Sequence, residues 1–155
     1  MTTRASALIP VAAVLHWTEE LPRFPRWEAR HFPEAGTTLH YLVISHIPLL
    51  VLFLVVAYLG WRSRPAGFGI QAVVAVHAAF LVNVLFQLGC TLAFWEYVPG
   101  NVTCAAVFVP FAAWHYHRIL ADGYLQPRAF ALAAGAGAIV SALLSVWVLY
   151  GWGVL

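Results

Sequence analysis

The sequence predicts an all-α integral membrane protein, a polytopic bundle of five transmembrane helices of which the first is short. Of its 155 residues 63% are apolar and only 9% are charged, whereas soluble domains are about half apolar and about a quarter charged. The mean hydropathy is +0.82. The apolar residues fall into five segments, each near or above the roughly 17–25 residues that cross the hydrocarbon core. We expect residues 1–155 to form a single transmembrane domain.

The first segment, residues 5–20, is short and ends in polar side chains. Residues 21–38 are then expected to form a loop, because they contain three prolines and five charged residues. Aromatic residues favour the headgroup region of a bilayer, and this loop contains Phe24, Trp27 and Phe32. The second segment, residues 39–61, is the clearest span and ends before Arg62.

The third segment, residues 68–95, is long enough to cross the bilayer with tilt. A Pro-Gly turn at residues 99–100 separates it from the fourth segment, residues 102–117. Asn101 or Thr103 is expected to cap the start of that fourth helix.

The fifth segment, residues 128–152, follows a turn signal at Asp122-Gly123. Residues 133–138 within it are all Ala or Gly. Small residues allow a neighbouring helix to approach closely, so this stretch is expected to lie at a helix–helix contact.

The arginines indicate an orientation, because cytoplasmic loops of membrane proteins are enriched in basic residues. With the N-terminus in the cytoplasm and the C-terminus outside, five arginines lie inside and three outside. The inner arginines are Arg4, Arg62, Arg64, Arg118 and Arg128, and the outer ones are Arg23, Arg26 and Arg30.

The first segment closes with His16-Trp-Thr-Glu19-Glu20. At spacing i, i+3 and i+4, the imidazole and the two carboxylates share one face of a helix. Ionisable groups at membrane depth are costly and usually face a bundle interior or a water-filled cavity, where they mark a functional site. The motif therefore predicts a polar site inside the bundle.

Other segments supply polar residues to the same region. His46 lies in the outer half of the second segment, and Asn83 and Gln87 share one face of the third. His77 lies deeper on that third segment. Three helices are thus expected to converge on one intramembrane pocket.

Two kinds of enzyme chemistry suit this set. In the favoured one, a hydrolase-like enzyme binds a divalent metal, zinc or iron, through His16, Glu20, His46 and His77. Glu19 and Glu20 then act as acid and base or as ligands, His77 as a proton partner, and Asn83 as an orienting or oxyanion-stabilising donor.

In the metal-free alternative, adjacent carboxylates share a proton and catalyse acid–base chemistry, as in an isomerase or cyclase acting on a lipid or isoprenoid. A third possibility is a small carrier that couples to protons or cations. The partners expected are the lipid bilayer and a lipophilic substrate that enters sideways from it, and a homo-oligomer is left open.

Ordinary structural roles compete with these functions. Glu19 and Glu20 would then only end a helix and pair with Arg23. Asn83 and Gln87 would join helices by hydrogen bonds, and His115 and His117 are expected at a solvated helix end. The two cysteines, without CxxC spacing, are interpreted as small buried residues. A net charge of +2 does not suggest nucleic-acid binding.

The residues resemble a known family. His16-Trp-Thr-Glu19-Glu20, followed by a loop with Phe and Pro, and later Tyr97-Val-Pro-Gly100-Asn-Val-Thr103, are similar to the small bacterial membrane proteins named for their HXXEE motif. The resemblance covers roughly residues 11–120. It implies a protein of the bacterial inner membrane. It supports a functional site at the motif but does not indicate which reaction the site catalyses.

Overall fold

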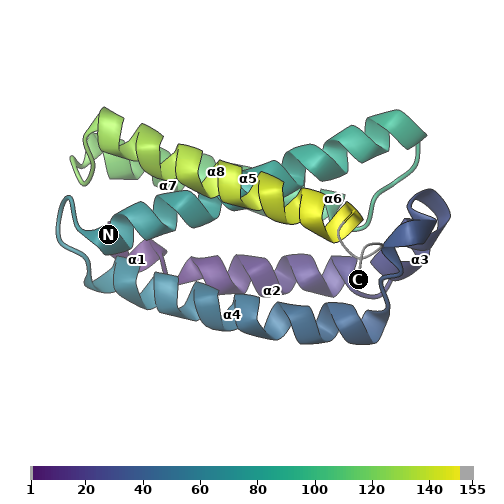
Figure 1. Ribbon diagram of the computed structural model, residues 1–155. Helices are drawn as coiled ribbons and strands as arrows, with labels where there is room; N and C mark the ends of the chain where they lie inside the picture. The colour runs from purple at the N-terminus through teal and green to yellow at the C-terminus, as the bar shows by residue number, and fades with distance from the viewer. Residues whose placement is uncertain (1, 151–155) are drawn as a thin grey trace.

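The computed structural model describes residues 2–150, with side chains from residue 2 to residue 146. It confirms the all-α prediction, because helices form most of these residues and no strand occurs among them. The long helices run side by side as a bundle (Figure 1).

The predicted first segment is two helices, α1 (Thr2–Ala5) and α2 (Leu8–Glu20). The break at residues 6–7 lies four residues before Pro10. Proline has no N–H to donate, and its ring clashes with the carbonyl of the fourth residue before it. The chain therefore closes this turn with the shorter bond from Ile9 N to Ser6 O, at 3.1 Å.

The connection at residues 21–38 was predicted as a loop, but it contains a helix, α3 (Phe24–His31), and a 3₁₀ turn, η1 (Pro33–Ala35). Pro25 and Pro33 stand in first turns, where the missing N–H costs nothing and the fixed φ favours a helix. The end of α3 is fixed by Arg30 and His31, which both bind the Glu96 carboxylate, His31 through Nε2 at 2.8 Å.

Three long apolar helices follow: α4 (Leu39–Arg62), α5 (Phe68–Phe94) and α8 (Pro127–Tyr150). α4, α5 and residues Pro127–Val146 of α8 are long and apolar enough to cross a membrane. They expose many large apolar side chains, compatible with contact with membrane lipid. These helices indicate a membrane protein. The predicted end of the last helix at residue 152 lies outside the described residues.

The fourth predicted segment is longer than expected. α6 (Asn101–Thr103), a π-helical turn η2 (Cys104–Phe108) and α7 (Val109–Ala121) follow one another without a break. Pro110 explains the π turn, because a proline at the start of α7 removes one N–H from the regular helical ladder. Neither Asn101 nor Thr103 is the N-cap of this run, since Gly100 takes that position.

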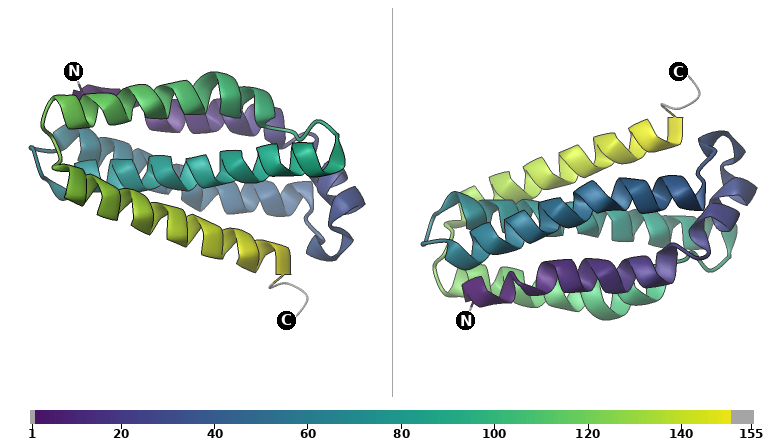
Figure 2. Two further views of the ribbon diagram at one scale, coloured as in Figure 1. Left: turned by 90° about the horizontal axis from the view of Figure 1, so that it is seen from above. Right: turned by 90° about the horizontal axis from the view of Figure 1, so that it is seen from below.

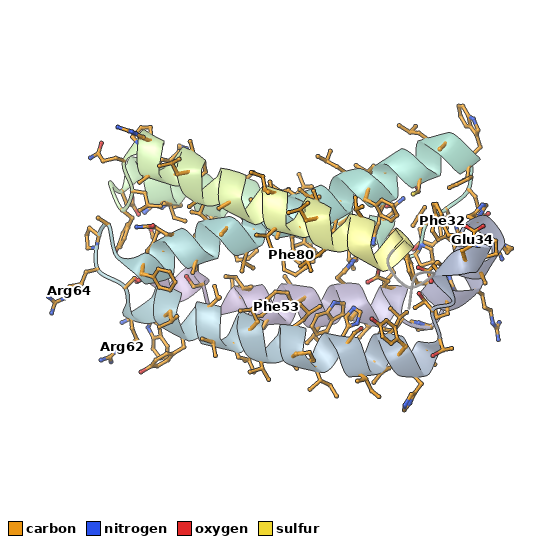
Figure 3. All side chains as sticks on the ribbon, viewed as in Figure 1. Phe32, Glu34, Phe53, Arg62, Arg64 and Phe80 are labelled. Carbon is orange, nitrogen blue, oxygen red and sulfur yellow. The ribbon has the colours of Figure 1, made fainter. Side chains whose placement is uncertain are left out.

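α5 lies at the centre of the bundle, in contact with α4, α7 and α8. Phe53 of α4 and Phe80 of α5 point toward each other (Figure 3), with ring centroids 4.9 Å apart. α8 crosses α5 so closely at Gly137 that a Cβ there would lie 2.0 Å from Ala75 O, which is the close contact expected of the small-residue stretch. Toward its C-terminal end α8 diverges from α4 and α5 (Figure 2).

The two ends of the bundle carry different sets of arginines. Arg62 and Arg64 lie at one end and Glu34 at the other (Figure 3). The loops after α4 and after α7 meet through Ala66 N and Tyr124 O, at 2.7 Å. α1 contacts both α4 and α7. The inner arginines predicted from the sequence therefore gather at the end of Arg62, and the outer ones on or beside α3.

Candidate functional site

The last two turns of α2 carry His16 and Glu20 on its inner face. His16 is 1% exposed and Glu20 9% exposed. Their spacing of four residues brings His16 Nε2 to 3.3 Å from Glu20 Oε2. The pair predicted from the motif is thus formed, and it faces the interior.

The hydrogen bonds of His16 fix the proton on its other nitrogen. His16 Nδ1 lies 2.9 Å from Thr103 Oγ1. The Thr103 hydroxyl donates its own hydrogen to Gly100 O, at 3.0 Å, so it accepts from His16, and Nδ1 carries the proton. The Nε2 atom is left to face Glu20, with Asn83 Nδ2 3.5 Å away.

His46 of α4 repeats this arrangement from the opposite side. Its Nδ1 lies 2.6 Å from Leu42 O, and because a carbonyl only accepts, Nδ1 must donate. His46 Nε2 then lies 4.0 Å from Glu20 Oε2. Two imidazole nitrogens therefore face one carboxylate oxygen, each with its proton held on the far side of the ring.

A positive centre among these acceptors would stabilise them. Burial in a medium of low dielectric makes unpaired acceptors and charges costly. A proton shared between His16 and Glu20 would supply that centre, and so would a metal cation. The arrangement can therefore hold and transfer a proton, or bind a metal.

A second row of buried groups orients Glu20. Gln87 of α5 is fully buried and donates from Nε2 to Glu20 Oε1, at 3.2 Å. Cys104 Sγ in turn donates to Gln87 Oε1, at 3.2 Å. Cys104 is buried, as the sequence analysis expected, but its thiol has a polar partner that spacing alone did not reveal.

Glu19 has a different role from Glu20. Its Oε1 accepts from Gly100 N at 3.2 Å and from Val102 N at 3.1 Å, and its Oε2 accepts from Thr103 N at 2.8 Å. The Tyr97 hydroxyl also donates to it. A carboxylate is stabilised by the free N–H groups and positive dipole end at a helix start. Glu19 thus caps the helix at residue 101, and among the described residues no hydrogen bond joins its carboxylate to Glu20, His46 or Asn83.

Gly100 makes this close approach possible. Its φ is +104°, and a Cβ there would lie 2.6 Å from His16 Cε1 and 2.8 Å from Gln87 Nε2. Burial and, to a smaller extent, the hydrogen bond to Glu19 raise the pKa of Tyr97 to about 12. The Tyr97 hydroxyl therefore remains a donor at neutral pH. The two motifs at residues 16–20 and 97–103 form one structural unit.

His77 does not join this unit. It is fully buried, and its Nε2 lies 3.0 Å from His115 Nδ1. His115 Nε2 bonds Thr2 O at 3.0 Å. The structure therefore pairs His77 with α7 and α1, not with Glu20 and His46 as the sequence analysis expected. The expectation that His115 is solvated is wrong, since it is fully buried, whereas His117 is exposed.

A cavity of about 720 Å³ adjoins the polar group. α2, α3, α4, α5 and α8 line it. Its lining is mostly apolar, and the polar side chains gather toward α3: they include His16, Glu20, Glu28, Thr37, Tyr41, Ser45, His46 and Asn83. Leu49 and Leu52 of α4 and Val140 and Leu144 of α8 line it and are 38–56% exposed, so the cavity opens between α4 and α8.

Sequence reasoning missed Glu28, which it treated only as one charge of the loop. Glu28 is 2% exposed, and its Oε2 has no hydrogen-bond partner in the described part of the chain. Burial raises the pKa of its carboxyl, against a hydrogen bond from Thr37. The signal available was its place three residues after Pro25, which is the second residue of α3 and favours the start of a helix.

The donor atoms at the site suit a metal, but the geometry is incomplete. Imidazole nitrogen and carboxylate oxygen are the ligands that zinc and iron take in proteins. Each imidazole also has its Nδ1 proton bound by a second group, as metal-bound histidines do. Among the described residues, however, no group of three His, Cys, Asp or Glu side chains has the geometry to hold a metal ion without rearrangement.

Comparison with known protein families gives a match over most of the chain. A family model described as "Protein of unknown function with HXXEE motif" matches residues 7–115. The match includes α2, the Tyr97–Thr103 turn and the polar face of α5. No curated protein and no solved structure matches the chain.

Proposed function

The chain belongs to the family of proteins of unknown function defined by the HXXEE motif, and we propose that it is an intramembrane enzyme that acts on a lipophilic substrate by acid–base chemistry. One observation carries this proposal. His16 Nε2 and His46 Nε2 both face Glu20 Oε2, at 3.3 and 4.0 Å, on the wall of an apolar cavity.

The opening between α4 and α8 supports a substrate that enters from the bilayer. The residues at this opening are aliphatic, and α4 and α8 are among the helices long enough to cross a membrane. We further propose that α1–α2 and the run at residues 101–121 complete a five-pass bundle. The end of this bundle that carries Arg62 faces the cytoplasm, because more arginines lie there than at the other end. The C-terminus is then outside.

In this mechanism Glu20 and His16 hold one proton between Oε2 and Nε2. Whichever atom has the proton acts as the general acid toward a substrate group in the cavity, and the other is ready to act as a base. His46 Nε2 provides a second base on the opposite wall. Asn83 Nδ2, close to His16 Nε2, orients the imidazole or donates to a substrate oxygen.

A second candidate is the metal-dependent enzyme, favoured by the two imidazoles that present Nε2 to one carboxylate. His16, Glu20 and His46 would hold a zinc or iron ion, and His77 would not contribute. When bound, such an ion polarises a substrate oxygen or activates water. Elemental analysis of the purified protein, beside His46→Gln, separates the candidates: stoichiometric metal lost in the variant identifies the metal enzyme.

The lateral entrance can be tested with a matched pair of variants. Val140 and Ile139 are neighbours on α8, both more than half exposed, but only Val140 lines the cavity. We expect Val140→Trp to fill the entrance and Ile139→Trp to leave it open. Purified protein in nanodiscs would be incubated with a membrane lipid extract, and converted species identified by mass spectrometry.

The expected result is conversion by wild type and Ile139→Trp, reduced at least roughly tenfold in Val140→Trp, because a misplaced or excluded substrate loses the positioning on which catalysis depends. Equal conversion by all three proteins would contradict entry between α4 and α8. Proton flux in liposomes, without lipid conversion, would instead identify a carrier.

A further inference from the structure

We propose that the cavity selects a lipophilic amine, with Glu28 as the residue that binds its charged head group. This inference rests on the proposed function for the site, and it names the chemical class of the substrate. It starts from the buried Glu28 Oε2 that has no hydrogen-bond partner among the described residues.

Apart from the histidines of the Glu20 site, the charged side chains on the described cavity wall are carboxylates. Glu20 and Glu28 both line it, close enough for the charge of Glu20 to act on Glu28. Among the described lining residues there is no Arg, and the sequence contains no Lys. At Glu28, a phosphate or carboxylate head group would meet an acidic side chain with no Arg or Lys beside it, which is unfavourable in a low-dielectric site. A cationic head group meets complementary charge.

The position of the acids suits an amphiphile. Glu28 is on α3, at the end of the bundle where α4 starts (Figure 1), and the aliphatic lining continues from there toward Leu52 and Val76. A head group at Glu28 would therefore leave its alkyl chain along α4 and α5. The cavity volume of about 720 Å³ is within the range of small-molecule binding sites.

The free carboxyl oxygen explains why an amine, rather than an alcohol, is preferred. Burial raises the pKa of Glu28 in the empty cavity. An ammonium group placed beside it favours the carboxylate form and makes a charge-assisted hydrogen bond, about twice as strong as a neutral one. Trp17, Phe24 and Phe86 also line the cavity, and a cation is attracted to the face of an aromatic ring.

The test uses dodecylamine, dodecanol and dodecanoate, which share a chain length and differ in head group. Each is titrated into the full-length protein in detergent micelles, and native mass spectrometry measures the amount retained. Wild type is expected to bind the amine at least roughly tenfold more tightly than the alcohol, and to bind the carboxylate least. Glu28→Gln is expected to remove this preference and leave alcohol binding unchanged.

Two control variants keep the result interpretable. Glu34→Gln removes an exposed carboxylate from the same connection and should bind like wild type. Glu28→Asp keeps the charge and should retain a preference for the amine, even if Glu28→Gln folds poorly. Equal binding of amine and alcohol by wild type, or an amine preference that survives Glu28→Gln, would overturn the inference.

The inference and the proposed function can fail separately. If lipid conversion depends on Glu20 while the amine is not preferred, only the substrate class is wrong. If the amine is preferred through Glu28 while Glu20→Gln converts lipid as wild type does, the amine site is supported and the proposed acid–base mechanism is wrong.

Discussion

Glu20→Gln is expected to lower lipid conversion by roughly 100- to 10,000-fold, the usual contribution of a general acid or base. The amide has the shape of the carboxyl and can still accept from Gln87 Nε2. It cannot hold the proton or the metal that His16 Nε2 and His46 Nε2 require beside them. The nanodisc assay with lipid extract measures the loss, and thermal unfolding is followed on the same preparation.

Glu34→Gln is the matched control for this variant, since it makes the same chemical change at an exposed position. It should convert lipid at the wild-type rate. We expect the unfolding midpoint of Glu20→Gln to stay within a few degrees of wild type, because ordinary substitutions that keep a buried group hydrogen-bonded cost little. Wild-type conversion by Glu20→Gln would remove Glu20 from the mechanism.

Glu19→Ala is expected to lower the stability of the fold, whereas Glu20→Gln is expected to lower activity. The substitution leaves the N–H groups of Gly100, Val102 and Thr103 without their acceptor at a helix start. Loss of a capping side chain costs about 0.5–2 kcal/mol, and this carboxylate accepts three backbone hydrogen bonds at a helix start, so we expect a total on the order of 3 kcal/mol. For a chain of this size the unfolding midpoint should fall by roughly 10 °C.

Tyr97→Phe is the graded comparison for Glu19→Ala. It removes a single donor, at a side chain that is 43% exposed, and should lower the midpoint by no more than a few degrees. A Glu19→Ala protein that unfolds like wild type but has lost lipid conversion would show that Glu19 is catalytic, as the sequence analysis expected.

The sequence was sufficient for the pairing of His16 with Glu20, because spacing i, i+4 on a helix determines which side chains are neighbours. It also identified His46 and Asn83, since isolated polar residues inside apolar spans tend to face a common interior. The cap formed by Glu19 could not be derived in this way. It depends on the turn at residues 97–103, about eighty positions away, folding against the end of α2.

The misplacement of His77 has a simpler cause. His77 and Asn83 are six residues apart, and at 3.6 residues per turn this rotates them by roughly 240° around α5. The two side chains therefore leave the helix in different directions, one toward α7 and the other toward α2. The helical part of residues 21–38 was missed because its prolines were treated as breakers, although proline in a first turn starts a helix.

The central claim is that His16, Glu20 and His46 surround one positive centre. Nitrogen NMR of the histidine side chains, in protein labelled with ¹⁵N histidine, tests it most directly. In wild type at neutral pH we expect protonated Nδ1 atoms on both rings, and a His16 Nε2 that is protonated or bound to metal. In Glu20→Gln the same Nε2 atom should carry neither a proton nor a metal. A His16 ring that is neutral in both proteins, with the proton on Nε2 and none on Nδ1, would contradict the account.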